Sequence, residues 1–388
     1  MLKADINDLL EKIFIVALTM VAMGLVMVSS SSMALSDHGY GSMNYHTNAH
    51  LIRIALGIFL AYIVSHIGIT VLRRFSPTFM LAGLLLSALV FVPGLSVDVN
   101  GASRWLRFGP LVFQPYDLFK LGYILFFAYA LDRYLKKDDI GGIKMSVLVL
   151  IMVALMLLSQ PDFGSLTLLV SVMLLTVVLV TGLTKNLIYS VMILAASFVW
   201  LIVSEPYRMK RIATLFDPWS DRYGSGFQLI QAMVAEGSGG IAGIGLGESI
   251  QKMLYLPEAH TDFTISIFAE EVGMVGVLIA MLLSMYLYVL LMRLSMKLRH
   301  NEFLFEGYVV FLVANFIFIQ FLFNIGVNYG LLPTKGITLP FMGYGGTSVV
   351  SHIIMIGMVM SLRKLPVQET QKSSSHMHMR GAGFAPAM

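Results

Sequence analysis

Runs of apolar residues, each about 20 residues long, recur along the chain and are separated by shorter polar segments. A helix of that length crosses the roughly 30 Å hydrocarbon layer of a bilayer, so each run predicts a membrane-spanning helix. The pattern predicts ten such helices, over residues 13–34, 51–71, 77–96, 115–134, 145–160, 163–182, 187–205, 263–292, 303–325 and 345–362. The predicted fold class is therefore an all-α integral membrane protein, a ten-transmembrane-helix bundle.

The polar segment between the seventh and eighth apolar runs, residues 206–261, is far longer than the other connections. Loops of this size are usually either functional or disordered. Phe227, Ile230, Met233 and Val234 recur at helical spacing, which predicts an amphipathic segment at the membrane surface. We therefore expect a large folded external loop between helices 7 and 8.

All the apolar runs fit within one polytopic membrane domain, residues 1–365, which includes this loop. The segment 366–388 is rich in Ser, His and Met and has no apolar run, so we expect a disordered cytoplasmic tail. The first 12 residues are polar and lack a small-residue cleavage site. The first apolar run is therefore expected to remain in the membrane.

Composition supports the membrane prediction and narrows the range of functions. Hydrophobic residues make up 57% of the 388 positions and charged residues 12%, which is far more apolar than a soluble domain. With a cytoplasmic N-terminus, 16 of the 26 Lys and Arg residues fall on cytoplasmic segments, so both termini are predicted to be cytoplasmic. The net charge of +4 has this simple explanation and does not indicate nucleic acid. Cysteine is absent, which excludes disulfides and thiolate metal sites.

The strongest candidate for catalysis lies where the large loop meets the eighth apolar run. There the motif Leu256-Pro257-Glu258-Ala259-His260-Thr261-Asp262-Phe263 places the Asp262 carboxylate at the rim of the membrane. Such a carboxylate is also an ordinary helix-capping group, and its position alone favours neither interpretation. Charged neighbours, however, suit a base that acts on an anionic, lipid-linked substrate. These neighbours are Glu258, His260, Lys252, Arg208, Lys210 and Arg211.

Other polar residues have structural as well as functional interpretations. Asp117 and Lys120 lie three apart on the fourth helix, so a structural ion pair and a substrate contact are equally supported. Arg53 is expected to snorkel to lipid head groups, and Asp162 is expected to cap the sixth helix. Trp105 is either an interfacial anchor or a residue that stacks on a sugar ring.

Three further patterns favour structural roles. The glycines between Gly239 and Gly247 follow no predicted strand, so they indicate close backbone approach between the loop and the bundle and not nucleotide binding. Glu270 and Glu271 are expected to serve helix packing. Residues 330–340 are too rich in Gly and Pro for a spanning helix, so they are expected to be buried in protein or to line a polar cavity.

Several of these stretches resemble the signature motifs of the SEDS family, the FtsW and RodA peptidoglycan polymerases. They are Asp217-Pro218-Trp219, Gly224-Ser225-Gly226-Phe227-Gln228, Leu256 to Phe263 and Leu332 to Gly346. The resemblance extends from about the first helix to residue 363, and Pro333-Thr334-Lys335-Gly336 is most similar to the FtsW branch of cell division. It implies a ten-helix glycosyltransferase that joins lipid II units into glycan strands on the outer face of the bacterial cytoplasmic (inner) membrane, at the division septum.

The resemblance also implies roles for individual residues. Asp262 matches the family's essential acid, and Trp105 matches a functionally sensitive tryptophan. Arg53, Lys120 and Asp162 align with polar positions that line the family's central cavity. We thus predict Asp262 as the catalytic residue. The predicted substrate-binding residues are Arg53, Trp105, Asp117, Lys120, Asp162, Arg208, Lys210, Arg211, Glu258, His260 and Lys335.

The chain departs from the family pattern at two places. Tyr116 and Asp117 stand where the family usually has Ser and Glu, which shortens the acid by one methylene. Gly343 and Thr347 stand where serines are common, and we expect these changes to affect packing more than chemistry.

The expected partners are lipid II, membrane lipid, a class B penicillin-binding transpeptidase of the FtsI type and other membrane proteins of the division machinery. No dedicated metal site is expected, because His260 has no second histidine or cysteine nearby, but Mg²⁺ or Mn²⁺ accompanying the lipid pyrophosphate is compatible with the sequence. Three alternatives stay open: a lipid II flippase, a RodA-like polymerase of cell elongation, and a structural scaffold.

Overall fold

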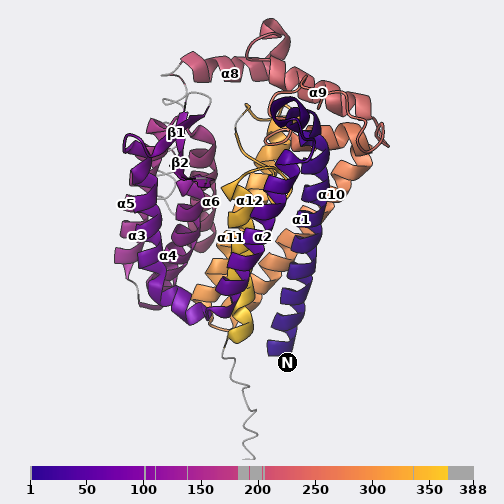
Figure 1. Ribbon diagram of the computed structural model, residues 1–388. Helices are drawn as coiled ribbons and strands as arrows, with labels where there is room; N and C mark the ends of the chain where they lie inside the picture. Colours follow the sequence, from indigo (N-terminus) through magenta and orange to yellow (C-terminus); the bar gives the residue numbers. More distant parts are fainter. Residues whose placement is uncertain are drawn as a thin grey trace, which may run out of the picture.

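Long helices form the body of the protein. The computed structural model describes residues 2–99, 102–109, 111–137, 139–181, 206–334 and 336–365, together with the single positions 192 and 203. The helices are α1 (Leu2–Tyr40), α2 (Tyr45–His66), α3 (Ile69–Ala88), α4 (Pro115–Lys137), α5 (Ile140–Ser159), α6 (Phe163–Thr181), α8 (Pro206–Phe216), α9 (Phe227–Gly239), α10 (Thr264–His300), α11 (Leu304–Asn328) and α12 (Thr347–Met360). Short 3₁₀ turns follow at Leu89–Phe91, Pro218–Asp221 and Ser361–Lys364. Helices α8 and α9 lie across one end of the long helices (Figure 1).

The helical membrane architecture agrees with the sequence prediction. Seven of the described helices are long and apolar enough to cross a membrane. Every predicted run overlaps a helix except 187–205, of which only positions 192 and 203 are described, and the end of the run 77–96 extends beyond α3 to the first residue of β1. The tail 366–388 lies outside the described residues. Helix α11 lies at the centre of the bundle, since 78% of its most apolar 18-residue stretch is buried inside the protein, whereas the corresponding share for α2 is 17%.

Helix ends differ from the apolar runs that predicted them. Helix α1 covers 39 residues and α10 covers 37, whereas α2 begins six residues before its predicted start, at Tyr45. Hydropathy marks only the part of a helix that faces lipid, while backbone hydrogen bonding continues into polar sequence. The polar side chains His46 and His50 therefore belong to α2, not to a loop.

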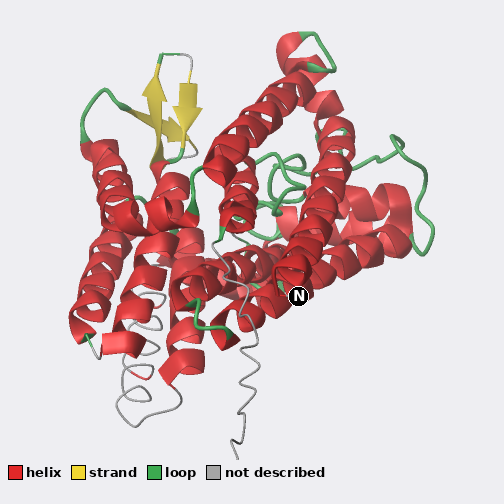
Figure 2. Cartoon of the chain, turned by 90° about the horizontal axis from the view of Figure 1, so that it is seen from below, coloured by secondary structure: helices red, strands yellow, loops and turns green. Residues whose placement is uncertain are grey.

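A small antiparallel sheet interrupts the otherwise helical fold and corrects the all-α prediction. Its strands β1 (Ser96–Val99), β2 (Ala102–Phe108) and β3 (Leu111–Phe113) lie in the order β1-β2-β3 between α3 and α4, and Figure 2 shows them at one edge of the molecule. Val97 pairs with Trp105, and Leu106 pairs with Phe113. The sequence prediction did not include this sheet, although the dipeptides Asn100-Gly101 and Gly109-Pro110 are of types common in turns.

Helix α10 is broken at Gly273, which adopts a left-handed φ of 73°. The glycine-rich segment after α9 fills the break: the amides of Ile244 and Gly245 donate to the carbonyls of Glu270 and Glu271, each at 3.0 Å. In return, the amide of Met274 donates to the carbonyl of Gly240 at 2.9 Å. This confirms the close backbone approach that the glycines predicted.

Glu270 and Glu271, two adjacent acids of α10, also bind residues of this loop, which agrees with the structural role predicted for them. Glu270 accepts hydrogen bonds from the amides of Ile250 and Gln251 and from the Ser249 hydroxyl. Glu271 forms a fully buried ion pair with Lys252 at 2.8 Å. Lys252 therefore has a structural role, and it is not one of the charged groups that act on Asp262.

The predicted amphipathic segment is helix α9, but its buried face differs from the predicted stripe. Ile230 is buried, whereas Met233 and Val234 are exposed. The small residues Ala232 and Ala235 lie on the buried face instead, because α9 packs tightly on α10. The large loop is therefore folded onto the bundle, as expected.

Candidate catalytic site at the start of helix α10

The residues before α10 form a tight turn around Glu258. Glu258 has a left-handed φ of 55°, and its carbonyl accepts hydrogen bonds from the amides of Thr261, Asp262 and Phe263, each at 3.2 Å. Its carboxylate accepts a further hydrogen bond from the Thr261 hydroxyl at 2.8 Å. This turn fixes the position of Asp262 relative to the helix.

The Asp262 side chain does not cap the helix. The N-cap residue of α10 is Phe263, which provides no side-chain cap. The Asp262 carbonyl instead accepts hydrogen bonds from the side-chain amides of Asn324 and Asn328 on α11, at 2.9 and 3.0 Å. Among the described residues, none donates a hydrogen bond to the Asp262 carboxylate. The backbone is thus held while the carboxylate is left available for a substrate.

Four charged groups lie within electrostatic range of the Asp262 carboxylate. Burial and, to a smaller extent, the negative charge of Glu258 raise the pKa of Asp262 to about 8. Arg104 and Arg211 oppose this shift, whereas Asp162 adds to it. The structure therefore brings together four predicted residues, Asp262, Glu258, Asp162 and Arg211, and adds Arg104, which the sequence prediction missed.

Arg104 and Trp105 reach the site from strand β2. Arg104 donates hydrogen bonds to the carbonyls of Gln160 and Pro161 at 3.0 and 2.6 Å, which docks the sheet on the start of α6. The half-buried Trp105 ring lies close to Gly346, because a Cβ at that glycine would be 3.4 Å from the ring. The neighbouring position of Arg104 and Trp105 in the sequence was a signal for this arginine.

Asp162 caps α6 as predicted. Its carboxylate accepts hydrogen bonds from the Ser165 amide at 3.1 Å and from the Ser165 hydroxyl at 2.7 Å. It also accepts a hydrogen bond from the Gln114 side chain at 3.0 Å. Asp162 therefore joins the start of α6 to the segment that leads into α4.

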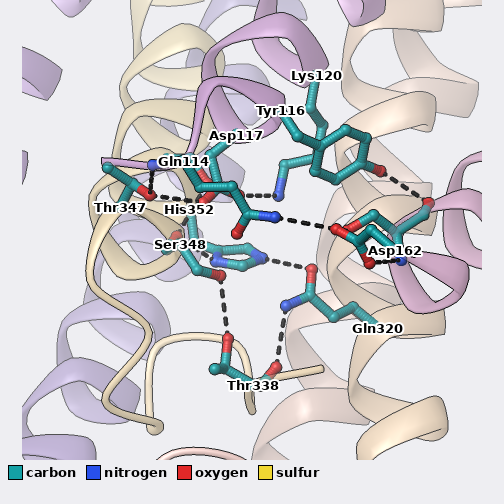
Figure 3. A network of polar contacts seen from close by, with 12 residues as sticks. Gln114, Tyr116, Asp117, Lys120, Asp162, Gln320, Thr338, Thr347, Ser348 and His352 are labelled. Atoms are coloured by element: carbon teal, nitrogen blue, oxygen red, sulfur yellow. Dashed lines mark hydrogen bonds and ion pairs between the residues drawn. The ribbon is translucent and has the colours of Figure 1, made fainter. Parts of the chain in front are cut away.

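Asp117 and Lys120 form a buried ion pair on α4, with Lys120 Nζ 3.2 Å from Asp117 Oδ1. The Thr347 hydroxyl donates to the other Asp117 oxygen at 2.9 Å and accepts from the Gln114 amide at 3.0 Å. Figure 3 shows this network beside His352, which contacts Gln320. Thr347 thus supplies a hydroxyl, as a serine would, and its role extends beyond the packing expected for it.

His260 and Arg53 meet around Tyr344. The His260 ring lies 5.4 Å from the Tyr344 ring and 5.3 Å from the His46 ring, measured between centroids. The Arg53 guanidinium lies 4.5 Å from the Tyr344 ring centroid. Burial lowers the pKa of His260 to about 4, although Glu258 opposes this shift. His260 is therefore neutral near pH 7, and Arg53 faces the protein interior and not only lipid head groups.

The predicted cationic cluster of the large loop is divided. Arg211 donates to the carbonyl of Thr334 and remains within range of Asp262. Lys210 is exposed and pairs instead with Asp221 at 2.8 Å, and this hydrogen bond lowers the pKa of Asp221. The structure therefore does not place Lys210 at the site, in contrast to the prediction. The Arg208 side chain and Lys335 lie outside the described residues.

The segment 330–340 is buried in protein over its second half, as its composition predicted, whereas Leu331 is 74% exposed. Ile337 and Leu339 are buried, and the carbonyls of Ile337 and Thr338 accept hydrogen bonds from Asn324 and Gln320 of α11. A Cβ at Gly336 would lie 3.5 Å from Asp262 Oδ2. This segment therefore forms one wall of the site. Within the described ranges, no group of three or more His, Asp or Glu residues is arranged to hold a metal ion.

The fold and the site define a class: polytopic helical membrane proteins that hold an acidic group among cations, beneath a folded loop. The chain matches the family of FtsW, RodA and SpoVE, described as cell cycle proteins, over residues 10–366, and it belongs to that family.

Curated relatives carry a more specific name. The chain is 36% identical over 353 residues to the probable peptidoglycan glycosyltransferase FtsW of Coxiella burnetii, covering 90% of this chain and 95% of that protein. It is 38% identical over 347 residues to the protein of the same name from Hydrogenovibrio crunogenus, covering 89% and 88% of the two chains.

Solved structures share the architecture. A chain from a peptidoglycan synthase complex, described as coordinating polymerization and crosslinking, is 26% identical with a TM-score of 0.73, covering 91% of this chain and 96% of that chain. The rod shape determining protein RodA of Thermus thermophilus is 25% identical with a TM-score of 0.66, covering 92% and 97%.

Proposed function

We propose that this protein is a peptidoglycan glycosyltransferase of the FtsW branch, which polymerises lipid II into glycan strands during cell division. The names of the relatives support this reaction and its place in division. One observation carries the mechanism: the Asp262 carboxylate caps no helix, and no described residue donates a hydrogen bond to it.

In this mechanism Asp262 is the general base. It accepts the proton of the acceptor's sugar hydroxyl as that oxygen bonds to the anomeric carbon of the donor, while the bond from that carbon to the pyrophosphate oxygen breaks. A base whose pKa lies near the working pH suits this step, and the pKa of Asp262 is raised to about 8.

The leaving lipid pyrophosphate is anionic and needs cations nearby. Arg104 and Arg211 are within electrostatic range of Asp262 and supply positive charge on that side. Arg53, Trp105, and the Asp117–Lys120 pair line the approach to the donor and acceptor sugars in our proposal, with Lys335 as a further cation. Any Mg²⁺ or Mn²⁺ would enter with the pyrophosphate and not through a protein-held site.

We further propose that ten helices span the inner membrane, that both termini are cytoplasmic and that the large loop is external. The seven apolar helices and the uneven distribution of Lys and Arg support this orientation. It places Asp262 on the outer face, where polymerised glycan is needed.

We also propose a class B penicillin-binding transpeptidase as the partner, together with other membrane proteins of the division machinery. The similarity to a chain of a complex that coordinates polymerization and crosslinking supports this partner.

The deciding experiment reconstitutes the wild type and Asp262→Asn in liposomes with labelled lipid II and the partner transpeptidase. It measures glycan chain length and lipid translocation separately. We expect Asp262→Asn to lose about 10²- to 10⁴-fold of the polymerisation rate, as the loss of a general base does, while lipid II binding is retained. The Asp262 side chain caps no helix and accepts no hydrogen bond from a described residue, and Asn has nearly the same size, so the fold is expected to be preserved.

Two outcomes would contradict the proposal. Long glycan strands made by Asp262→Asn at near wild-type rate would remove Asp262 as the base. A wild-type protein that translocates lipid II without polymerising it would instead support a flippase. Lys210→Gln serves as the matched control, because that cation pairs with Asp221 away from the site and its loss should leave the polymerisation rate nearly unchanged.

A further inference from the structure

Residues at the start of α3 and the end of α4 line a polar pocket. These helix ends lie at the opposite end of the long helices from α8 and α9 (Figure 1). The volume of the pocket is about 310 Å³. The residues that line it are Arg73, Tyr129, Asp132, Arg133, Lys136 and Lys137. Four of these six side chains are cationic and only one is a carboxylate, so an anion is the class of ligand that the pocket favours.

Ion pairs hold three of the four cations of this pocket. Asp132 is almost fully buried, and it pairs with Arg73 and with Lys136, the latter at 2.8 Å. The exposed Arg133 pairs with Asp139, and its guanidinium donates to the Tyr129 hydroxyl at 3.3 Å. These three cationic groups are therefore positioned before any ligand arrives, which lowers the entropy cost of binding.

The carboxylates around the pocket do not pair with all of its cations. Among the described residues, Lys137 has no ion-pair partner. Glu306 lies behind the pocket, buried at the start of α11, in range of Arg73 and Asp132. The adjacent residue Asp138 lies outside the described residues. The exposed rim, Arg133 and Lys137, is therefore the part of the pocket that faces an incoming anion.

The pocket lies at the ends of helices whose outer faces are apolar. Val71 and Phe75 of α3 are 44% and 46% exposed, and they lie two positions on either side of Arg73, so they face away from the pocket. Leu135 of α4 and Ile140 of α5 are 43% and 51% exposed. On a membrane-spanning bundle such side chains face acyl chains, which puts the cations of the pocket at the level of the head groups, where anionic phospholipids present their phosphates.

We propose that this pocket binds the phosphate group of an anionic phospholipid from the leaflet opposite to Asp262. Arg133 and Lys137 contact the phosphate oxygens, Arg73 and Lys136 supply the positive field behind them, and the acyl chains enter the hydrocarbon layer beside these helix ends. The site is separate from the proposed polymerisation site, and its occupation does not require lipid II.

Native mass spectrometry of the purified full-length protein tests this site. The detergent-solubilised protein is titrated with phosphatidylglycerol or with phosphatidylcholine, and the bound lipids are counted. We expect one phosphatidylglycerol to bind preferentially, and Arg133→Gln/Lys137→Gln to weaken it about 25-fold, since each Lys or Arg near an anionic surface contributes about fivefold. This variant keeps the buried Asp132 paired with Arg73 and Lys136, so folding is expected to be unaffected.

The control variant Arg74→Gln/Lys144→Gln removes the same charge from exposed positions of α3 and α5 that do not line the pocket. It should bind phosphatidylglycerol as the wild type does. An equal loss in the control, or no preference for phosphatidylglycerol in the wild type, would overturn the site. Competition by inorganic phosphate that fully displaces the lipid would show a soluble phosphate site and overturn the assignment to lipid.

Discussion

At Asp262, burial and the negative charge of Glu258 act in the same direction, because both favour the protonated carboxyl. A general base works only when it is deprotonated. The working form of Asp262 is therefore the minor one below about pH 8, the raised pKa of this residue. The polymerisation activity is then expected to depend on pH in a range where an aspartate with an unshifted pKa is already fully deprotonated.

The first prediction at this scale is that kcat/KM for glycan polymerisation rises with pH and levels off above about 8, the pKa of Asp262. The measurement is a pH–rate profile in liposomes under conditions where chemistry limits the rate. Glu258→Gln removes a negative charge that raises this pKa, so the midpoint should move to lower pH. A profile that is flat from pH 6 to pH 9 would be incompatible with Asp262 as the base.

A second prediction concerns the buried pair of Asp117 and Lys120. Removing one partner leaves an uncompensated buried charge, which costs about 3–5 kcal/mol. Asp117→Asn and Lys120→Met should each lower the thermal unfolding midpoint in detergent more than the double variant does. Additive losses in a double-mutant cycle would show that the two side chains act independently.

The candidate residues were predictable to different degrees. Local spacing, which is visible in the sequence, was enough to identify Asp262, Asp162 and the Asp117–Lys120 pair. Lys210 was misplaced because its partner Asp221 is chosen by the fold of the loop. Asn324 and Asn328 were missed, although two amides one turn apart on an apolar helix were a usable signal.

At the scale of elements, apolar runs located the helices, whereas the features that shape the site depend on contacts between distant segments. The sheet that carries Trp105 was missed because its strands are short and lie beside long helical runs. The break in α10 was not visible either, since Gly273 lies inside the predicted span 263–292 and one glycine within such a span does not by itself indicate a break. Only the pairing with the Gly239–Gly245 segment makes that break stable.

The prediction at this scale is that Gly273→Ala is strongly destabilising. Gly273 has a φ of 73°, and a Cβ there would lie 2.4 Å from the Gly243 nitrogen and from the Ile241 carbonyl oxygen. A left-handed conformation costs a non-glycine residue about 1–3 kcal/mol, and the clash with backbone adds to this. The readout is the midpoint of thermal unfolding in detergent.

Gly237→Ala on α9 is the matched control for this substitution. A Cβ at Gly237 meets nothing within 4 Å, and replacing a helical glycine by alanine stabilises a helix by about 0.5–1 kcal/mol. The two alanine variants should therefore shift the midpoint in opposite directions. A neutral effect at Gly273 would mean that the break is not required for stability.

At the scale of the whole molecule, the two ends of the bundle carry different chemistry. The acid site and the large loop occupy one end, and the basic pocket of α3 and α4 occupies the other. The orientation inferred from Lys and Arg places the loop outside and the pocket inside.

The chain contains no cysteine, so single cysteines report this orientation without background. Ser220→Cys in the large loop and Asn301→Cys between α10 and α11 are both at exposed positions. In intact cells, or in spheroplasts if an outer membrane is present, a membrane-impermeant maleimide should label Ser220→Cys and should label Asn301→Cys only after permeabilisation. The reverse pattern would invert the proposed topology.

The buried ion pair between Lys252 and Glu271 has a consequence for how a substrate arrives. The Ser30 hydroxyl of α1 donates to Glu271 at 2.6 Å, so the pair ties the large loop to two helices at once. Lifting the loop would strand a charge inside the bundle, at a cost of several kcal/mol. The part of the loop around Lys252 is therefore fixed to the bundle and is not a mobile lid. A lipid-linked sugar is then expected to reach Asp262 laterally from the bilayer, with its lipid tail still in the membrane.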